Sequence, residues 1–315
     1  MATSLITSSK FKNHDTGEGF PESPKRLDAI TDHLKSTGLI KKLDIVEPNR
    51  STKSICGLVH NEDYITRVRR ACKMGAPIID TADNPISKSS YDTALLAIGG
   101  ITKAVDIVLS GNNKNAMVLL RPPGHHAEKD RAMGFCLFNN IAVAVKYVQQ
   151  NHKVEKVVII DFDVHHGNGT QHIFEEDPSV MFISLHQFPF YPGTGAIDEV
   201  GIGKGKGTTV NYPLKMGAGD KEFLDIFENS LTDKVLKYNP DIILISAGFD
   251  AHVNDPIGGL NITTDGFNQI SNIIKNLATE TCGGKIVSSL EGGYNLAALA
   301  ESVEAHLLAL QGIKT

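Results

Sequence analysis

The sequence predicts an α/β fold built on a largely parallel sheet, and three observations support this. Short, β-branched apolar runs recur along the chain, helical patterns lie between them, and Gly and Pro cluster directly after several of the runs. Strands that helices cover on both faces are apolar on both sides, and alternating strands and helices are typical of doubly wound sheets. Such sheets bind ligands at the carboxyl ends of their strands, where these Gly/Pro clusters fall.

Five apolar runs predict buried strands. They are NAMVLL at 115–120, KVVII at 156–160, SVMFISL at 179–185, DIILISAG at 241–248 and GKIVSSLEGG at 284–293. A further strand, TTVNYPL, follows the loop GIGKGKG at 201–207. That loop lacks the spacing of a phosphate-binding loop and precedes a strand rather than a helix, so we expect a mobile turn there.

Three longer segments, at 91–110, 139–150 and 221–238, have the apolar spacing of helices. No Pro/Ser-rich linker, internal repeat or low-complexity tract interrupts the alternation. We therefore expect residues 1–315 to form a single catalytic domain. The basic run RVRRACK at 67–73 is compatible with a partner-binding patch, but a solvated helix face is the favoured interpretation.

Composition narrows the classes of function. The 315 residues carry a net charge of -5, which gives no broad basic surface and makes direct binding to nucleic acid unexpected. The four cysteines are far apart and form no CxxC pair, as expected of a reduced, cytoplasmic protein. The N-terminal segment lacks an apolar stretch of signal-peptide length. The sequence also contains no run of about 18 apolar residues, so association with a membrane is not expected.

Polar residues follow the predicted strand at 156–160 in VVIIDFDVHHGNGTQ, residues 157–171. Alternate residues of a strand point the same way about 6.6 Å apart, so Asp161, Asp163 and His165 are expected on one side. Asp250 follows the strand DIILISAGF in the equivalent place. Each aspartate alone is compatible with a turn cap. Together, Asp163, His165 and Asp250 form a three-ligand set that leaves a zinc ion one open position.

Two histidines and a tyrosine follow other predicted strands. His125 and His126 lie in RPPGHH, and Tyr294 lies in EGGYN. A pair of histidines is often structural, but beside a metal-bound water it can supply the base that takes a proton. Tyr294 is either a buried core residue or a hydrogen-bond donor to an oxyanion.

Six segments, in order along nearly the whole chain, resemble the zinc-dependent histone deacetylase family. The resemblance is to its class II branch and to the bacterial histone deacetylase-like amidohydrolases and acetylpolyamine amidohydrolases. The segments are HDTGEGFPESPKRL at 14–27, RPPGHHAEKDRAMGFCLFNN at 121–140, DFDVHHGNGTQ at 161–171, SLHQFPFYPGTG at 184–195, SAGFDAHVNDPIGG at 246–259 and SLEGGYN at 289–295.

The resemblance implies the arginase/deacetylase fold, with an eight-stranded, mainly parallel sheet and helices on both faces. It also implies one Zn²⁺ per chain, bound by Asp163, His165 and Asp250. The expected activity is removal of acetyl or other acyl groups from the ε-amine of lysine in a protein or peptide, by a metal-activated water.

The same resemblance implies catalytic roles. His126 matches the general base and His125 its electrostatic partner, although the division of proton transfers between them stays open. Asp161 and Asn168 match the residues that hydrogen-bond to His125 and His126 respectively, so the two imidazoles are expected to differ in basicity. Tyr294 matches the oxyanion donor.

The acyl-lysine tunnel is expected to be walled by Gly134 and Phe135 together with Phe190 or Tyr191. Ile257 stands where one branch of polyamine deacetylases carries an acidic gatekeeper. An apolar residue there gives a polyamine nitrogen no partner, so a peptide-linked lysine is the favoured substrate and an acetylpolyamine or another small amide the alternative.

The resemblance also implies a structural potassium ion and a route for acetate. The potassium ligands would be the main-chain oxygens of Asp161, Asp163, His165 and Leu185 and the hydroxyl of Ser184. Arg26 matches an arginine that lines the internal cavity through which acetate leaves.

Two other classes of function are weighed against this one. A binuclear manganese hydrolase needs further carboxylates at positions that read Gly167 and His252 here, which disfavours a second metal. A non-catalytic acyl-lysine binding protein is disfavoured because the ligands, both histidines and Tyr294 are all present. The oligomeric state is left open.

Overall fold

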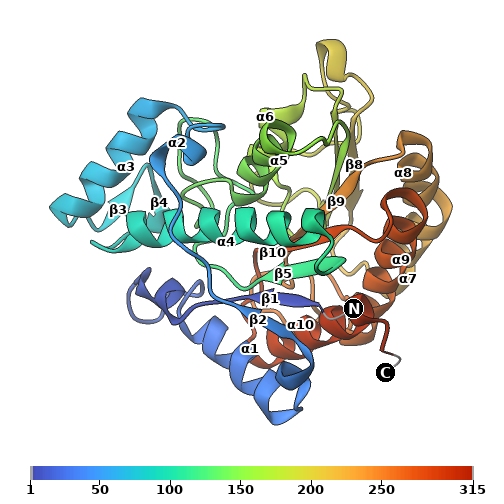
Figure 1. The fold of residues 1–315 in the computed structure, drawn as a ribbon, viewed down its shortest axis with the longest axis horizontal. Coiled ribbons are helices and arrows are strands. Elements are labelled where there is room, and N and C mark those ends of the chain that lie inside the picture. Colours follow the sequence, from blue (N-terminus) through green and yellow to red (C-terminus); the bar gives the residue numbers. More distant parts are fainter. Residues whose placement is uncertain (1–2, 314–315) are drawn as a thin grey trace.

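Eight strands form one sheet, and every neighbouring pair is parallel, in the order β2-β1-β5-β10-β9-β6-β7-β8. The computed structural model describes residues 3–313 (Figure 1). The strands are β1 Ser4–Ile6, β2 Asp44–Val46, β5 Asn115–Val118, β6 Val157–Asp161, β7 Val180–Gln187, β8 Thr209–Leu214, β9 Ile242–Ala247 and β10 Ile286–Leu290. The predicted α/β class is confirmed, with a sheet that is wholly rather than mainly parallel.

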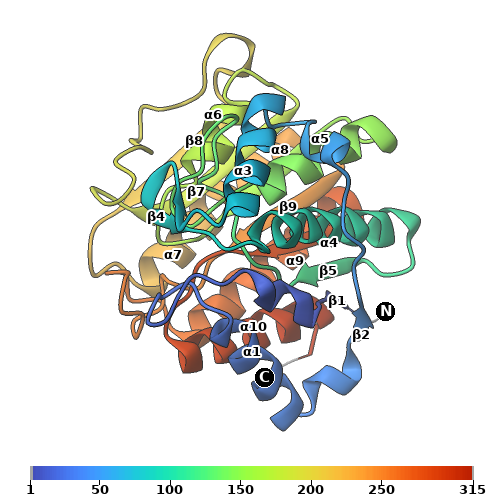
Figure 2. The same ribbon diagram turned by 90° about the vertical axis from the view of Figure 1, so that its left-hand side faces the viewer.

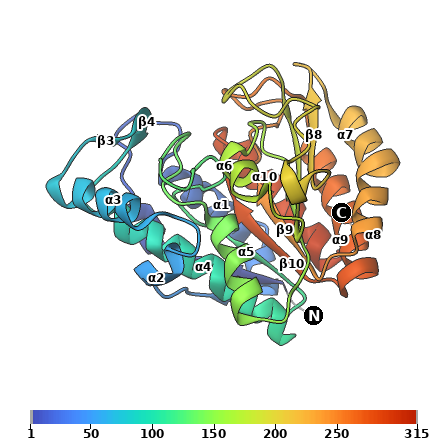
Figure 3. The same ribbon diagram turned by 90° about the horizontal axis from the view of Figure 1, so that it is seen from above.

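Helices cover both faces of the sheet (Figure 3). Helices α1, α9 and α10 pack together on one face, and α4 and α5 pack together on the other. The helices are α1 Lys25–Ser36, α2 Lys53–Cys56, α3 Glu62–Met74, α4 Ser90–Ser110, α5 Asn140–Asn151, α6 Asn168–Phe174, α7 Asp220–Ile226, α8 Thr232–Tyr238, α9 Thr264–Cys282 and α10 Leu296–Gln311.

Two sequence segments differ in detail from their prediction, and a third agrees with it. The helix expected at 221–238 is divided by a π-helical segment, Phe227–Leu231, between α7 and α8. The loop at 201–207 contains a short 3₁₀ turn, Gly203–Gly205. In RVRRACK, Val68 and Cys72 are buried and the basic side chains face outward, as expected of a solvated helix face.

Helix α4 is long and apolar enough to cross a membrane by length and composition alone. In this fold 78% of its most apolar stretch is buried inside the protein. It packs against α5, β1 and β5, so its apolar composition is that of a core helix.

A small antiparallel pair, β3 Ile78–Ile79 and β4 Thr81–Pro85, lies outside the main sheet beside α3 (Figures 1 and 2). Neither this pair nor the short strands β1 and β2 was expected from the sequence. The pair brings Asp83 to the mouth of the cavity described below.

The register of the central strands aligns their carboxyl ends. Asp161 at the end of β6 pairs with Ser184 of β7 and with Ser246 of β9. The loops that follow these strands therefore begin at one edge of the sheet, as expected for ligand sites in parallel sheets.

Candidate active site

Asp163, His165 and Asp250 converge at this edge of the sheet. Each offers one ligand atom, and the three atoms lie within 4.8 Å of one another. His165 Nδ1 is 3.1 Å from Asp163 Oδ1 and 3.2 Å from Asp250 Oδ2. All three residues are buried. The convergence joins the loop after β6 to the loop after β9, although the residues lie far apart in the sequence.

The surroundings of these three residues suit a divalent cation. Main-chain N–H groups fix the carboxylates: Gly292 donates to Asp163 Oδ2 at 2.8 Å, and Val164 donates to Asp250 Oδ1 at 2.9 Å. Asp250 Oδ2 is buried and, apart from its 3.2 Å contact with His165 Nδ1, has no hydrogen-bond partner within residues 3–313. Burial and the charge of Asp163 raise the pKa of Asp250 to about 7. A cation would offset this repulsion, and the Asp, His, Asp donor set fits zinc.

Two glycines make room for the cluster. A Cβ atom added at Gly248 would overlap the Asp163 carboxylate, and one added at Gly292 would overlap the carboxylate of Asp250. Only glycine therefore lets the two neighbouring loops approach the ligands so closely.

His125 and His126 lie beside the cluster, with their ring centroids 4.0 Å apart. His125 Nδ1 is 2.9 Å from Asp161 Oδ2, and His126 Nδ1 is 2.7 Å from Asn168 Oδ1. One imidazole thus faces a carboxylate and the other a neutral amide.

This difference gives the two histidines opposite protonation behaviour. Burial opposes protonation of His125, but the carboxylates of Asp161 and Asp163 outweigh it and raise its pKa to about 10. Burial and the positive charges of His125 and His165 hold the pKa of His126 well below its ordinary value. A charged imidazole and a neutral one, able to take a proton, therefore stand side by side.

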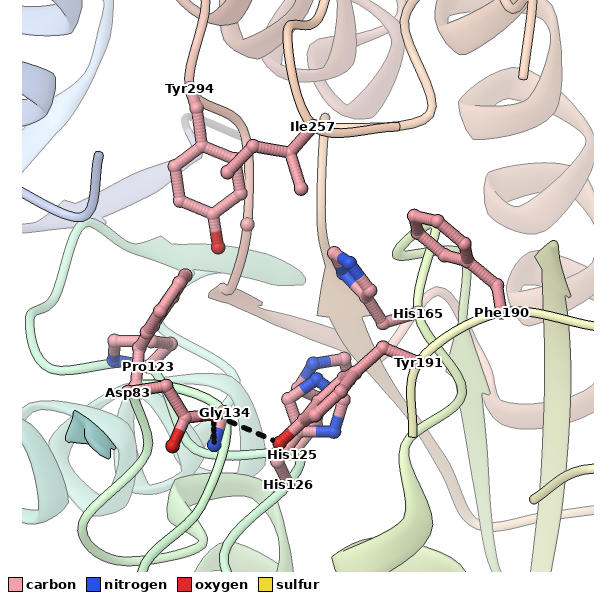
Figure 4. A pocket seen from close by; sticks show the side chains of 12 residues that line it. Asp83, Pro123, His125, His126, Gly134, His165, Phe190, Tyr191, Ile257 and Tyr294 are labelled. Carbon is pink, nitrogen blue, oxygen red and sulfur yellow. Dashed lines mark hydrogen bonds between the residues drawn. The ribbon is translucent and has the colours of Figure 1, made fainter. Parts of the chain in front are cut away.

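A cavity of about 220 Å³ opens above these residues (Figure 4). His125, His126, His165 and Tyr294 all line it. Burial and the negative charge of Asp250 raise the pKa of Tyr294 well above 10, so its phenol keeps its proton. Tyr294 is held in place through its main-chain N–H, which donates to Asp255 Oδ2 at 2.7 Å.

The residues expected to wall the tunnel line this cavity, and both Phe190 and Tyr191 do so. Phe190 stacks on His165 with centroids 5.2 Å apart, and Tyr191 meets His126 edge-on at 5.2 Å. Phe135 packs edge-on against Tyr294 at 5.8 Å. Ile257 also lines the cavity, so the opening is largely aromatic and apolar.

The turn before Phe135 is strained. Gly134 and Phe135 have φ of 59° and 68°, in the left-handed region that residues other than glycine rarely adopt. A Cβ at Gly134 would overlap the ring of His126. Strained backbone of this kind is common at functional sites, and here it brings the aromatic wall against the histidine pair.

Asp83 at the cavity mouth was missed by the sequence analysis. Its Oδ2 accepts hydrogen bonds from the main-chain N–H of Gly134 and from the Tyr191 hydroxyl, both at 3.1 Å (Figure 4). The segment TADNP has no strand periodicity, and only the hairpin carries Asp83 to the site. No local signal could have placed it there.

Arg26, Ser184 and Leu185, which were also expected to have roles in the site, do not line this cavity. The guanidinium of Arg26 is buried and donates to the main-chain oxygens of Gly293 and Glu291 and to the Glu22 carboxylate. The buried Ser184 hydroxyl pairs with His186 Nδ1 at 2.9 Å, and Leu185 is buried beside it. The potassium site and the acetate route remain predictions.

His166, the second histidine of VVIIDFDVHHGNGTQ, hydrogen-bonds to Thr194 and Gln171 and does not line the cavity.

Comparison with known proteins supports the resemblance. The histone deacetylase domain family matches residues 20–310. Histone deacetylase 10, chloroplastic, of Oryza sativa subsp. japonica is 41% identical over 302 residues, which cover 91% of this chain and 68% of that protein. Polyamine deacetylase HDAC10 of Homo sapiens is 36% identical over 90% of this chain and 43% of its own length.

A solved structure supports the same family. The crystal structure of the HDA15 HD domain superimposes with a TM-score of 0.94 at 38% identity, covering 99% of this chain and 88% of that one. The chain therefore belongs to the histone deacetylase family of hydrolases.

Proposed function

We propose that this chain is a zinc-dependent deacetylase that removes acetyl groups from the ε-amine of lysine in proteins or peptides. One observation carries the proposal: a single, mainly apolar cavity is lined by the histidine pair, by Tyr294 and by His165, and His165 lies beside the other two candidate zinc ligands, Asp163 and Asp250. Each type of group required for metal-assisted amide hydrolysis is present.

Zinc would be held by Asp163, His165 and Asp250, and when bound it would polarise the amide oxygen and acidify a water molecule. The Nδ1 atom of His126 is engaged by Asn168, which leaves Nε2 free to take a proton. His125 stays charged beside Asp161 and stabilises the negative charge that develops on the oxygen atoms at the reacting carbonyl. The protonated Tyr294 donates a hydrogen bond to the developing oxyanion.

The cavity walls favour a lysine side chain. Phe135, Phe190 and Tyr191 present aromatic surfaces to a methylene stem, and each CH₂ buried contributes about 0.8 kcal/mol. Ile257 offers no charge to a second amine. A carboxylate such as Asp83 at the mouth accepts hydrogen bonds from peptide N–H groups, which supports a peptide-linked substrate.

Asp83 also supports a second candidate, an acetylpolyamine, because its carboxylate can pair with a cationic nitrogen outside the cavity. One relative is named a polyamine deacetylase. The proposed reaction chemistry is the same for both substrates, so the choice depends on the mouth alone.

A substrate panel tests the proposal. We expect kcat/KM for an acetyl-lysine peptide to exceed that for acetylated spermidine and putrescine by at least about 10-fold, equivalent to about 1.4 kcal/mol. The reverse order would transfer the assignment to polyamines. No turnover on any of the three would contradict the deacetylase proposal.

Metal dependence is tested on the same substrates. Chelator treatment should abolish turnover, and zinc should restore it. Asp250→Ala should lower the bound zinc measured by elemental analysis as well as the activity. An Asp250→Ala protein that keeps full zinc content and activity would contradict the ligand assignment.

A further inference from the structure

Glu128 lies two residues beyond His126, in the segment that joins β5 to α5, and the proposed chemistry gives it no role. Its side chain is only 16% exposed. Its Oε1 atom accepts a hydrogen bond from Asn168 Nδ2 at 2.5 Å and lies 2.9 Å from His172 Nδ1. Glu128 therefore contacts the residue that contacts His126.

The two partners of Glu128 belong to one helix. Asn168 begins α6 and His172 stands one turn later, so both side chains project from the same helix face. The Glu128 carboxylate is held between them. This contact fixes the Glu128 segment against α6 at the point where α6 delivers Asn168 to the active site.

The orientation of the Asn168 amide decides what His126 meets. An amide has an acceptor end and a donor end of nearly the same shape, and its hydrogen bonds determine which end faces which neighbour. An ionised carboxylate only accepts hydrogen bonds, so Glu128 can pair only with the NH₂ end. The NH₂ end also donates to the main-chain oxygen of His126 at 3.3 Å. The oxygen end is then left for His126 Nδ1, at 2.7 Å.

We infer that Glu128 is a positioning residue which, through Asn168, holds His126 in the tautomer that carries its proton on Nδ1. The inference rests on the proposed function, in which His126 is the base. Because Asn168 Oδ1 accepts, Nδ1 must donate, and Nε2 keeps the lone pair that receives a proton. Without Glu128 the NH₂ end keeps only its longer contacts, to the His126 main-chain oxygen and to Met133 Sδ, both at 3.3 Å. The amide is then held less firmly, and the tautomer with Nδ1 unprotonated becomes accessible.

Glu128 is not part of a proton relay. The amide between Glu128 and His126 has no readily ionisable proton, so the contact transmits orientation rather than protons. The Glu128 variants should therefore change kcat and its pH profile while leaving the KM of the peptide nearly unchanged.

The test uses the full-length, zinc-loaded protein with an acetyl-lysine peptide. Glu128→Ala should lower kcat about 10-fold, which is a part of the roughly 10²–10⁴-fold that a positioned base contributes. Glu128→Gln keeps an acceptor and should recover most of this loss. In an Asn168→Ala background, Glu128→Ala should have no further effect, because its influence passes through Asn168.

His172→Ala is the matched control, because it removes the other partner of Glu128 and leaves Asn168 paired. It should keep kcat within about 2-fold of the parent, in the range of exposed ion pairs. If His172→Ala loses as much as Glu128→Ala, Glu128 only tethers the segment and the inference is wrong.

A readout independent of turnover completes the test. The ¹⁵N shifts of the His126 ring report which nitrogen carries the proton, and Glu128→Ala should move them toward a mixture of tautomers. Unchanged His126 shifts together with unchanged kcat would overturn the inference. If the parent protein hydrolyses none of the substrates, the proposed function fails, and the ¹⁵N shifts still decide the role of Glu128.

Discussion

At the scale of single residues, the site depends on glycines that let neighbouring segments approach its side chains closely. Gly134 lets the aromatic wall touch His126, and Gly248 and Gly292 let two loops reach the carboxylates. The loop of Gly292 also carries Tyr294, which lines the cavity. The site therefore requires these glycines as well as its candidate metal ligands.

Gly134→Ala should lower kcat by about 100-fold, because a displacement of about 1 Å near the chemistry has an effect of this size. The added Cβ would overlap the His126 ring and force it to move. Gly193→Ala is the control: Gly193 also has a positive φ of 92°, but within residues 3–313 no atom beyond its chain neighbours lies within 4 Å of an added Cβ. Equal losses in the two variants would show that backbone strain, rather than the displaced histidine, limits turnover.

Tyr191→Phe removes one of the two hydrogen bonds to Asp83 Oδ2 and leaves the aromatic wall intact. The freed carboxylate should favour cationic substrates, so kcat/KM for acetylated spermidine should rise several-fold relative to the acetyl-lysine peptide. Asp83→Asn should shift this ratio in the opposite direction. A ratio that does not change in either variant would show that Asp83 does not select the substrate.

At the scale of elements, long apolar strands were predictable and short ones were not. β6, β7 and β9 are five to eight buried residues each, long enough to show an apolar run. β1 and β2 have three residues each, too few for any pattern to emerge. Their strand structure depends on pairing with each other and with β5, which tertiary structure alone provides.

The candidate site could be anticipated for a related reason. Asp163, His165 and Asp250 follow strands whose ends were predictable, so their convergence followed from parallel topology. Asp83 and Glu128 could not be identified in this way. Asp83 depends on a short hairpin, and Glu128 depends on the helix face that Asn168 and His172 share.

The start of α9 gives a test at the scale of one helix. The Thr263 hydroxyl accepts a hydrogen bond from Gly266 N–H at 3.0 Å and donates to Asp220 Oδ2 at 2.6 Å. Thr263→Ala should lower the free energy of unfolding by about 1–2 kcal/mol, as for other N-cap residues, with kcat unchanged. Thr263→Ser keeps the hydroxyl and should restore most of the stability, as measured by denaturant unfolding. A Thr263→Ala protein as stable as its parent would contradict the capping role.

At the scale of the whole molecule, buried neutral histidines couple stability to pH. Burial lowers the pKa of His60, His186 and His306 to about 4 each. The unfolded chain takes up these protons near the ordinary pKa of about 6.5, and the folded chain only near pH 4. Their contribution to stability is therefore complete above pH 6.5 and is lost as the pH falls toward 4.

His306 isolates this effect, because it does not line the cavity and its two ring nitrogens pair with the hydroxyls of Ser271 and Ser288. Between pH 6.5 and 4 each such group contributes a slope of up to about 1.4 kcal/mol per pH unit to the free energy of unfolding. His306→Asn should reduce the slope by roughly that amount, whatever its effect at pH 7. Denaturant titrations at several pH values measure it, and parallel curves for the two proteins would contradict the assignment.

The place of β10 in the sheet has a consequence for how the protein is made. β10 lies between β5 and β9, so the strand groups β2-β1-β5 and β9-β6-β7-β8 are joined only through it. It is also the last strand in residues 3–313, and the loop that follows it carries Tyr294. The two strand groups therefore leave the ribosome before residues 286–290 do. Until β10 has emerged, the edges of β5 and β9 that it covers stay unpaired, and a chaperone that covers strand edges has most to protect in that interval.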